Sequence, residues 1–220
     1  MMEYFKKSLK KVMQFIVLIN FIYINGQESS DAYELLTNVS NKFQSYKNVS
    51  FDFNYILENK SEKIRQEIKG DATISKKLYK INFLEAIQLF DGNKVYTIIP
   101  ENEEITIIDP NNENDDLGIN ISNIFKFYKE GYSFEWDIKQ KIDGNIIQYI
   151  KLLPDTSNNE LKYILIGINE LKMTLYRIIE IGYENTQTTL TLLNQKENID
   201  LSDDYFKFKK ESYPDYYINQ

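Results

Sequence analysis

The 220-residue sequence contains neither cysteine nor histidine. Nucleophilic sites of the Ser-His-Asp and Cys-His kinds are therefore excluded, as are zinc sites built from histidine and cysteine. No disulfide can form, so stability has to come from the core alone. The eight glycines are scattered singly, and no Gly-rich phosphate-binding loop is present. These absences remove the residues that oxidoreductases, kinases and proteases usually need.

The apolar run near the N-terminus, Val12 to Ile24, is too short for a membrane-spanning helix, which needs about 20 mostly apolar residues. Gln14 and Asn20 interrupt it, four lysines precede it, and Gly26 supplies a small residue at a plausible cleavage site. These features are typical of an export signal. We therefore expect residues 1–26 to be a cleaved signal peptide, the alternative being an uncleaved N-terminal anchor.

Negative charge exceeds positive charge in the rest of the chain. The net charge is −7, and cleavage would lower it to about −10 because the removed segment carries four lysines and one glutamate. Such a charge argues against binding to nucleic acid or strong attachment to an anionic membrane surface. The chain is 42% hydrophobic and 27% charged, as in globular domains, and no linker divides it, so we expect one domain over residues 27–220.

Apolar spacing predicts a helix that begins at Ser30 or Asp31 and ends near Lys47, followed mainly by strands. Asp-Gly turns at Asp91 and Asp143, each between apolar runs, predict two hairpins. The predicted order is a helix, about five or six strands, a short helix ending at Gly131, and about five more strands. Some ten antiparallel strands should curl into a barrel or part of one, giving a mainly β fold with helices (α+β).

The first predicted strand has one large apolar face. Phe51, Phe53, Tyr55 and Leu57 occupy alternate positions, so their side chains point the same way. Two interpretations remain open from this pattern. The face is part of the core, which is the default, or it lines a ligand cavity.

Acidic residues suggest two further sites more weakly, a calcium site and the paired carboxylates of a hydrolase. The loop from Asp109 to Gly118 alternates carboxylates and amides like the start of a calcium site, but Asn114 replaces the turn glycine and Asn120 the bidentate glutamate. A solvated acidic loop is the interpretation we favour. Glu135 and Asp137 could be paired carboxylates of a hydrolase, although a solvent-facing polar edge explains them more simply.

Four stretches share their order with a known family: a helix running into a strand, a glycine-led strand, an Asp-Gly hairpin followed by proline, and a C-terminal segment with two phenylalanines before a proline. They read AYELLTNVSNKFQSYKNVSFDFNYIL, IKGDATISKKLYKINF, IQLFDGNKVYTIIPENEEITI and IDLSDDYFKFKKESYPDYYI. They sample nearly all of the mature chain and resemble the periplasmic outer-membrane lipoprotein carriers of the LolA type. The SNIFKFYKEGYSFEW stretch is similar to the branch found in Bacteroidetes-type bacteria.

The resemblance implies an incomplete, strongly curved antiparallel barrel, with a helical lid over a hydrophobic cavity that holds the acyl chains of lipoproteins. It implies a periplasmic, monomeric, non-enzymatic carrier without a cofactor. Such a carrier loads at an inner-membrane ABC-type releasing complex and unloads to an outer-membrane receptor or membrane. The receptor itself is lipid-anchored, and the absence of cysteine argues against that role here.

The expected lipid-binding residues come from three segments, and a register slip of one residue would turn a strand's set outward. They are Phe51, Phe53 and Tyr55 on the first strand, Ile121, Ile124, Phe125 and Tyr128 on the lid helix, and Phe134 and Trp136 on the next strand.

One feature departs from the family pattern. In the better-studied branch an arginine after the second strand holds the lid closed, whereas this chain has Lys76 and Lys77 there. Lysine lacks the planar five-donor fork of arginine, so that latch is not expected, and neither Arg65 nor Arg177 is assigned to it. The alternatives to a carrier are a periplasmic lipid-binding or envelope-stress sensor domain of the same fold and, more remotely, a secreted carboxylate-dependent hydrolase.

Overall fold

The computed structural model describes residues 30–109, 131–155 and 161–220. The expected signal peptide, the short lid helix and most of the acidic loop lie outside the described residues. The described residues form a helix over residues 30–45, twelve strands and two short 3₁₀ helices. The strands are β1 (Val49–Asn59), β2 (Ile64–Ser75), β3 (Leu78–Phe83), β4 (Ala86–Phe90), β5 (Val95–Ile99), β6 (Glu104–Ile108), β7 (Tyr132–Ile142), β8 (Asn145–Pro154), β9 (Leu161–Asn169), β10 (Thr174–Gly182), β11 (Thr186–Glu197) and β12 (Tyr217–Asn219), and the 3₁₀ helices are η1 (Pro100–Asn102) and η4 (Lys210–Ser212).

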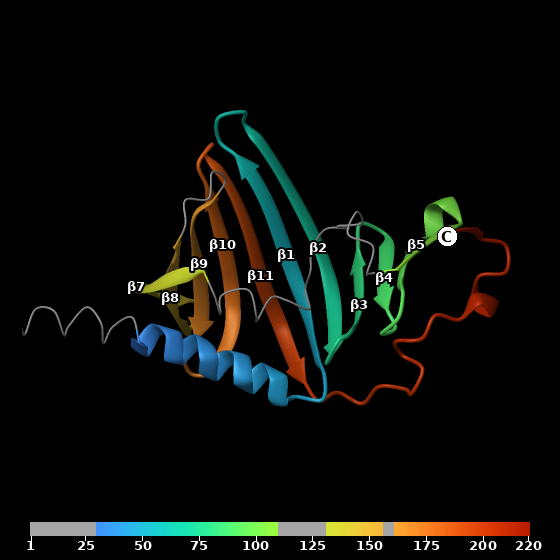
Figure 1. The fold of residues 1–220 in the computed structure, drawn as a ribbon, viewed down its shortest axis with the longest axis horizontal. Coiled ribbons are helices and arrows are strands. Elements are labelled where there is room, and N and C mark those ends of the chain that lie inside the picture. The colour runs from blue at the N-terminus through green and yellow to red at the C-terminus, as the bar shows by residue number, and fades with distance from the viewer. Residues whose placement is uncertain (1–29, 110–130, 156–160) are drawn as a thin grey trace, which may run out of the picture.

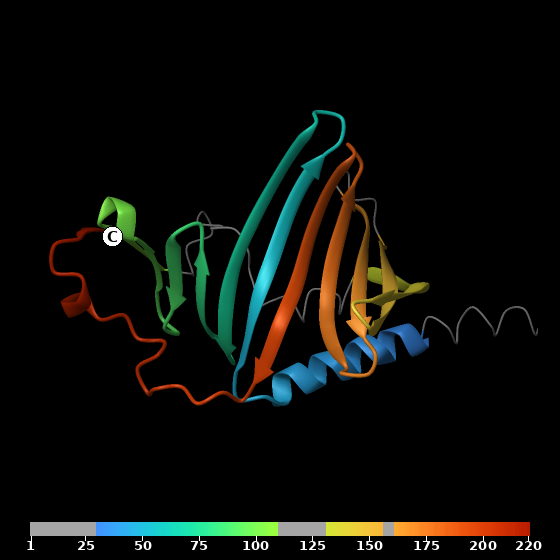
Figure 2. The ribbon, with the colours of Figure 1, turned by 180° about the vertical axis from the view of Figure 1, so that it is seen from behind.

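All twelve strands belong to one sheet, in the order β12-β6-β5-β4-β3-β2-β1-β11-β10-β9-β8-β7. Neighbours are antiparallel except for β12, which pairs with β6 in parallel. β1 is central because it pairs with β2 on one side and β11 on the other. The sheet twists and bends without closing, since β7 and β12 are its two ends (Figures 1 and 2). The predicted mainly β, open architecture is confirmed, with six strands on each side of the expected lid segment.

The N-terminal helix packs on one face of the sheet, which we call the inner face. Ala32, Leu36 and Val39 of its apolar stripe are at most 4% exposed, and Leu35 and Phe43 are partly buried against the same core. The helix crosses one end of the sheet, alongside β8 to β11 in Figure 1. Within the residues that the structure describes, no helix is long and apolar enough to cross a bilayer. The predicted helix is confirmed, and it ends at residue 45 rather than near 47.

Both predicted hairpins form. β4 and β5 meet at Asp91, whose Oδ1 accepts hydrogen bonds from the backbone N–H groups of Asn93 and Lys94 at 2.8 and 2.9 Å. The Tyr96 hydroxyl donates to Oδ2 at 3.0 Å. Desolvation opposes ionisation of this carboxyl, but the three hydrogen bonds outweigh it and lower its pKa. β7 and β8 meet at Asp143 and Gly144, both at positive φ, as hairpin turns of two residues require.

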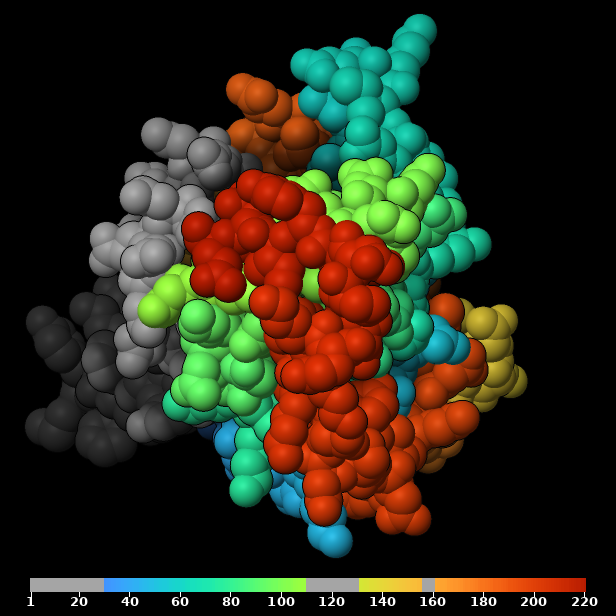
Figure 3. Space-filling view, turned by 90° about the vertical axis from the view of Figure 1, so that its right-hand side faces the viewer, coloured from blue at the N-terminus to red at the C-terminus, as the bar shows by residue number. Residues whose placement is uncertain are grey.

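The C-terminal segment, residues 198–219, covers part of the opposite face, which we call the outer face. In Figure 3 it lies across the strands that precede the lid segment. The Phe208 ring stacks on Tyr96 of β5 with centroids 4.4 Å apart, and the Tyr205 hydroxyl lies 3.1 Å from Thr73 Oγ1. Lys209 pairs with Asp204, and its hydrogen bond, helped by Ser202, lowers the pKa of Asp204 to about 2. The segment ends as β12 on the β6 edge.

Substituting Gly70 should destabilise the fold. Gly70 pairs with Phe53 across β1 and β2. A Cβ built there would lie 2.1 Å from the Asn82 carbonyl oxygen and 2.6 Å from Phe53 Cζ. The first contact is with backbone, so the strand would have to move. We expect Gly70→Ala to lower the free energy of unfolding by about 1–3 kcal/mol, measured by urea denaturation. A loss below about 0.5 kcal/mol, the usual range for a substitution that disturbs nothing, would contradict the steric argument.

Candidate lipid-binding face

The aromatic stripe of β1 lies on the inner face, as its register shows. Phe51 pairs with Ala72, Phe53 with Gly70 and Tyr55 with Ile68. Phe51 and Phe53 are each 2% exposed and belong to the same buried cluster as the helix stripe. The three side chains therefore share one face, and Phe51 and Phe53 are core residues beneath the helix. That these residues bind lipid stays a prediction.

The same stripe changes character farther along β1. Tyr55 is only partly buried, although it packs against the core cluster, and Leu57 is 36% exposed. Ile64, near the start of β2 and on the same face, is 46% exposed. The apolar face thus continues beyond the part of the sheet that the helix covers. The stripe on β1 is therefore core at its Phe51 end and accessible apolar surface at its Leu57 end.

The apolar face also extends sideways across the sheet. Strand registers place one apolar residue after another at the level of Tyr55, from β1 through β11, β10, β9 and β8 to the edge strand β7. The row is Tyr55, Leu190, Ile178, Ile166, Ile150 and Trp136. Its four middle residues are at most 8% exposed, so the row is core between its two ends.

The two aromatic residues predicted on β7 also lie on the inner face. Phe134 pairs with Leu152 and Trp136 with Ile150. The Phe134 ring meets Tyr33 of the helix edge-on, with centroids 5.2 Å apart. Trp136 is 36% exposed at the rim of the sheet. On β7, Phe134 therefore packs against the helix, whereas Trp136 is partly exposed at the edge of the sheet.

The predicted lid residues Ile121, Ile124, Phe125 and Tyr128 lie outside the described residues, so their contact with this face stays a prediction. Near the C-terminal end of the helix the described residues enclose a pocket of about 10 Å³, between Val39, Phe43 and Leu175 among others. That volume suits a single water molecule and is far too small for an acyl chain. The expected large hydrophobic cavity is not shown.

A polar group on the inner face was missed by the sequence analysis. Glu180 of β10 lies two residues after Ile178 and pairs with Thr188 of β11 and Ile164 of β9. The residue is exposed as a whole. Nevertheless, apolar neighbours displace part of the water around its carboxylate and so raise the pKa of Glu180. In the sequence, Glu180 lies two residues after Ile178, and on a strand this spacing places both side chains on the same face.

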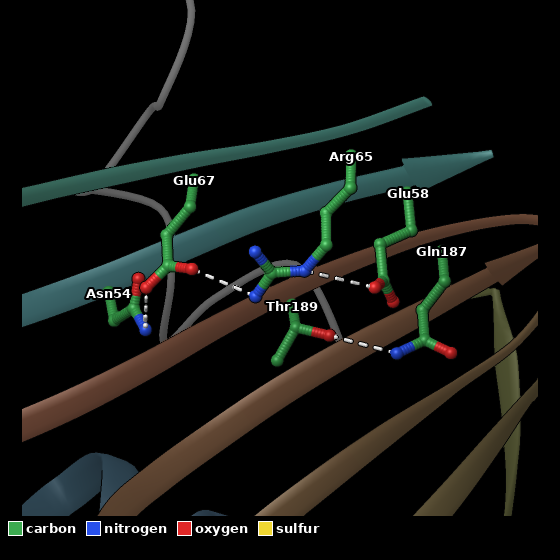
Figure 4. Close-up of polar contacts among 6 residues, drawn as sticks. All are labelled: Asn54, Glu58, Arg65, Glu67, Gln187 and Thr189. Carbon is green, nitrogen blue, oxygen red and sulfur yellow. Dashed lines mark hydrogen bonds and ion pairs between the residues drawn. The ribbon is translucent and has the colours of Figure 1, made fainter. Parts of the chain in front are cut away.

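The outer face beside β1 is polar, in contrast to the inner face. Arg65 pairs with Glu58 at 3.2 Å and Glu67 at 2.8 Å, and Asn54 donates to Glu67 at 3.1 Å (Figure 4). The hydrogen bond from Arg65 is the main cause that lowers the pKa of Glu67. These exposed pairs contribute little to stability. Beside β1, the apolar face of the sheet is therefore the inner one.

Both arginines lie on the outer face. Arg177 donates from Nε to Thr191 Oγ1 at 2.9 Å and from Nη2 to the Tyr176 hydroxyl at 3.3 Å. Arg65 is held by its two glutamates. Neither residue is placed to act as a latch on the inner face, in agreement with the sequence analysis.

The acidic pair of the hydrolase alternative belongs to edge strand β7. Glu135 lies 3.9 Å from Lys151 with a side chain 56% exposed, and Asp137 Oδ1 accepts a hydrogen bond from the N–H of Ile138. Glu135 pairs regularly with Lys151, whereas Asp137 lies in a register shift between Trp136 and Lys139. Among the described residues, no group of three or more carboxylates is placed to hold a metal ion.

No family model matches the sequence, and no curated protein matches it significantly. Solved structures do match. An uncharacterized conserved protein from Thermus thermophilus aligns over 86% of this chain and 98% of its own with 9% identity and a TM-score of 0.56. A LolA superfamily protein from Nitrosomonas europaea aligns over 82% and 98% with 9% identity and a TM-score of 0.42. A putative outer membrane lipoprotein-sorting protein domain from Vibrio parahaemolyticus aligns over 84% and 99% with 11% identity and a TM-score of 0.41. At these identities, the match to the Thermus thermophilus protein concerns the fold alone.

Proposed function

We propose that this protein binds acyl chains on the inner face of its sheet and carries lipoproteins through the periplasm from the inner to the outer membrane. The observation that supports it best is the presence of exposed apolar side chains at the margins of the inner face. Leu57 of β1 and Trp136 of β7 are each 36% exposed on a face that is otherwise core. The sequence resemblance to lipoprotein carriers agrees with this assignment.

The physical role of such a face follows from the cost of exposing acyl chains. Each CH₂ group transferred from water to an apolar site gains about 0.8 kcal/mol, so a chain crossing the periplasm needs an apolar cover. An open sheet offers that cover without enclosing the ligand permanently. The proposed partners are acylated lipoproteins, an inner-membrane ABC-type releasing complex and an outer-membrane receptor or membrane. Binding and handover need no covalent chemistry, so we propose a carrier rather than an enzyme.

The test uses the purified protein incubated with spheroplasts of the source bacterium. We expect acylated lipoproteins to leave the membrane as soluble one-to-one complexes, which gel filtration and immunoblotting detect. Leu57→Asp should reduce release at least tenfold, because a carboxylate on the acyl-binding face would have to be desolvated. Leu193→Asp is the matched control, since Leu193 is 41% exposed but pairs with Asp52 on the outer face.

Three outcomes distinguish a carrier, a lipid-binding or sensor domain, and a protein whose inner face is only core. Release that Leu57→Asp abolishes and Leu193→Asp preserves supports the carrier. Lipid that co-purifies with the protein without any release of lipoproteins would replace the carrier by a lipid-binding or sensor domain. Neither release nor bound lipid would mean that the inner face serves only as core.

A further inference from the structure

The inner face changes from apolar to polar between β1 and the β6 edge. Strand registers place six residues side by side on this face, one from each of β1 to β6. The first three are core residues at most 2% exposed, and the last three carry an amide and two hydroxyls. In order, the six are Phe51, Ala72, Ile81, Gln88, Thr97 and Thr106. We call Gln88, Thr97 and Thr106 the polar row.

Two members of the polar row have hydrogen-bonding groups that the described residues leave unpaired. Gln88 is 6% exposed, and its amide takes part in none of the side-chain hydrogen bonds among the described residues. Thr97 Oγ1 is buried without a hydrogen-bond partner. Nearly all buried polar groups in native proteins are paired, so each exception needs an explanation. Gln88 and Thr97 pair across β4 and β5, so the unpaired groups lie on adjacent strands at the same level.

Apolar side chains flank the polar row on both sides along the strands. Phe90, Val95 and Ile108 form the neighbouring row on one side, and all three are partly buried. On the other side, Ala86 and Ile99 lie two residues from Gln88 and Thr97 and therefore on the same face. Figures 1 and 2 show this half of the sheet beyond the helix. The polar row is thus a narrow polar strip within an apolar part of the inner face.

We propose that the polar row binds the ester carbonyl of an acylated ligand whose hydrocarbon chain lies against the flanking apolar residues. This inference rests on the proposed function and adds the chemical class of the ligand's polar group. The Gln88 amide has two N–H donors and each threonine has one O–H donor, whereas an ester carbonyl is purely an acceptor. A phosphate or carboxylate fits less well, because β4 to β6 contain no basic residue and Glu104 lies on the same face as Thr106.

The site should distinguish two neutral ligands of equal chain length, methyl dodecanoate and dodecyl methyl ether. Both carry the alkoxy oxygen, so a difference between them measures the carbonyl group. We expect the purified protein to bind the ester about tenfold more tightly than the ether, as one or two hydrogen bonds would give. Displacement of the neutral fluorescent probe N-phenyl-1-naphthylamine, at ligand concentrations below the solubility limits, measures both dissociation constants.

Variants of the polar row assign the preference to its side chains. Thr97→Val keeps the shape of the side chain and removes the hydroxyl, so it should lower the ratio of ester to ether affinity to about threefold. Adding Gln88→Leu should bring the ratio close to one while ether binding stays unchanged. Thr97→Val should not lower the midpoint of urea denaturation, because its hydroxyl has no partner to lose.

Thr189→Val is the matched control, because it removes a threonine hydroxyl from the outer face. Thr189 is 9% exposed and pairs with Ile56, and its Oγ1 accepts a hydrogen bond from Gln187 Nε2 at 3.1 Å (Figure 4). This variant should keep the full preference for the ester.

The failures of the two proposals are distinguishable. If the protein binds ester and ether equally, or if its preference survives in the double variant, the carbonyl site is overturned while acyl binding stands. A lower denaturation midpoint in Thr97→Val with an unchanged ratio would also overturn it, because the hydroxyl would then serve the fold. If neither ligand binds and no lipoprotein is released from spheroplasts, the proposed function fails and this inference fails with it.

Discussion

Phe53→Ala is expected to lower the free energy of unfolding by about 3–5 kcal/mol, the usual cost of removing a buried phenylalanine ring. Phe53 is 2% exposed and packs in the cluster that joins the helix to the sheet. It also faces Gly70, which offers no side chain that could move into the vacated space. The cavity would therefore stay largely open, and urea denaturation should place the loss toward the upper end of that range.

Tyr55→Ala is the matched variant, because Tyr55 lies two residues farther along the same face of β1. It is partly buried, so its removal should cost only about 1–2 kcal/mol. The difference between the two variants measures where the stripe changes from core to accessible surface. Equal losses would contradict that division, and the whole stripe would then be core.

The two hairpins could be predicted from the sequence, and so could the set of β1 side chains that share one face, because local chemistry determines both. Asp91 bonds two backbone N–H groups within its own turn, and Asp143 precedes a glycine at positive φ. Alternation fixes which β1 residues share a face, whatever the rest of the sheet does. The helix was predictable for the same reason, since its apolar stripe follows from spacing alone.

The division of the stripe could not be predicted, because it depends on where the helix lies across the sheet. Phe53 and Leu57 have the same pattern in the sequence, yet Phe53 lies in the buried cluster with the helix and Leu57 is 36% exposed. Glu180 was missed for a related reason. Its strand is apolar on both faces, so no alternation indicated which face the glutamate occupies until registers with β9 and β11 were known.

The path of the C-terminal segment was also beyond local reasoning. β12 pairs with β6, more than 100 residues earlier, and does so in parallel. Nothing in the three residues of β12 specifies that partner. The pairing covers the β6 edge of the sheet, which would otherwise offer free N–H and C=O groups to other chains.

Removing this segment should have the other large effect on stability. The outer face of β4 to β6 carries apolar side chains that are fully buried, among them Leu89, Tyr96, Ile98 and Ile105. Phe208 stacks on Tyr96, and Ile218 of β12 pairs with Ile105. A chain that ends at Leu201 would expose this surface together with the β6 edge. At about 1.5–3 kcal/mol for each large side chain that returns to water, we expect a loss of about 4 kcal/mol or more.

Two full-length variants keep this prediction measurable if the shortened chain fails to fold. Phe208→Ala removes one stacking partner of Tyr96 and should cost about 2–4 kcal/mol in urea denaturation, less than a fully buried ring because Phe208 is only partly buried. Tyr217→Ala alters a side chain that is 69% exposed and should change stability by less than about 0.5 kcal/mol. The shortened chain should also associate through its uncovered β6 edge, which light scattering detects. A monomeric shortened chain as stable as the full-length protein would show that the segment adds nothing to the fold, and the burial of Ile98 and Ile105 would then have to come from the strands themselves.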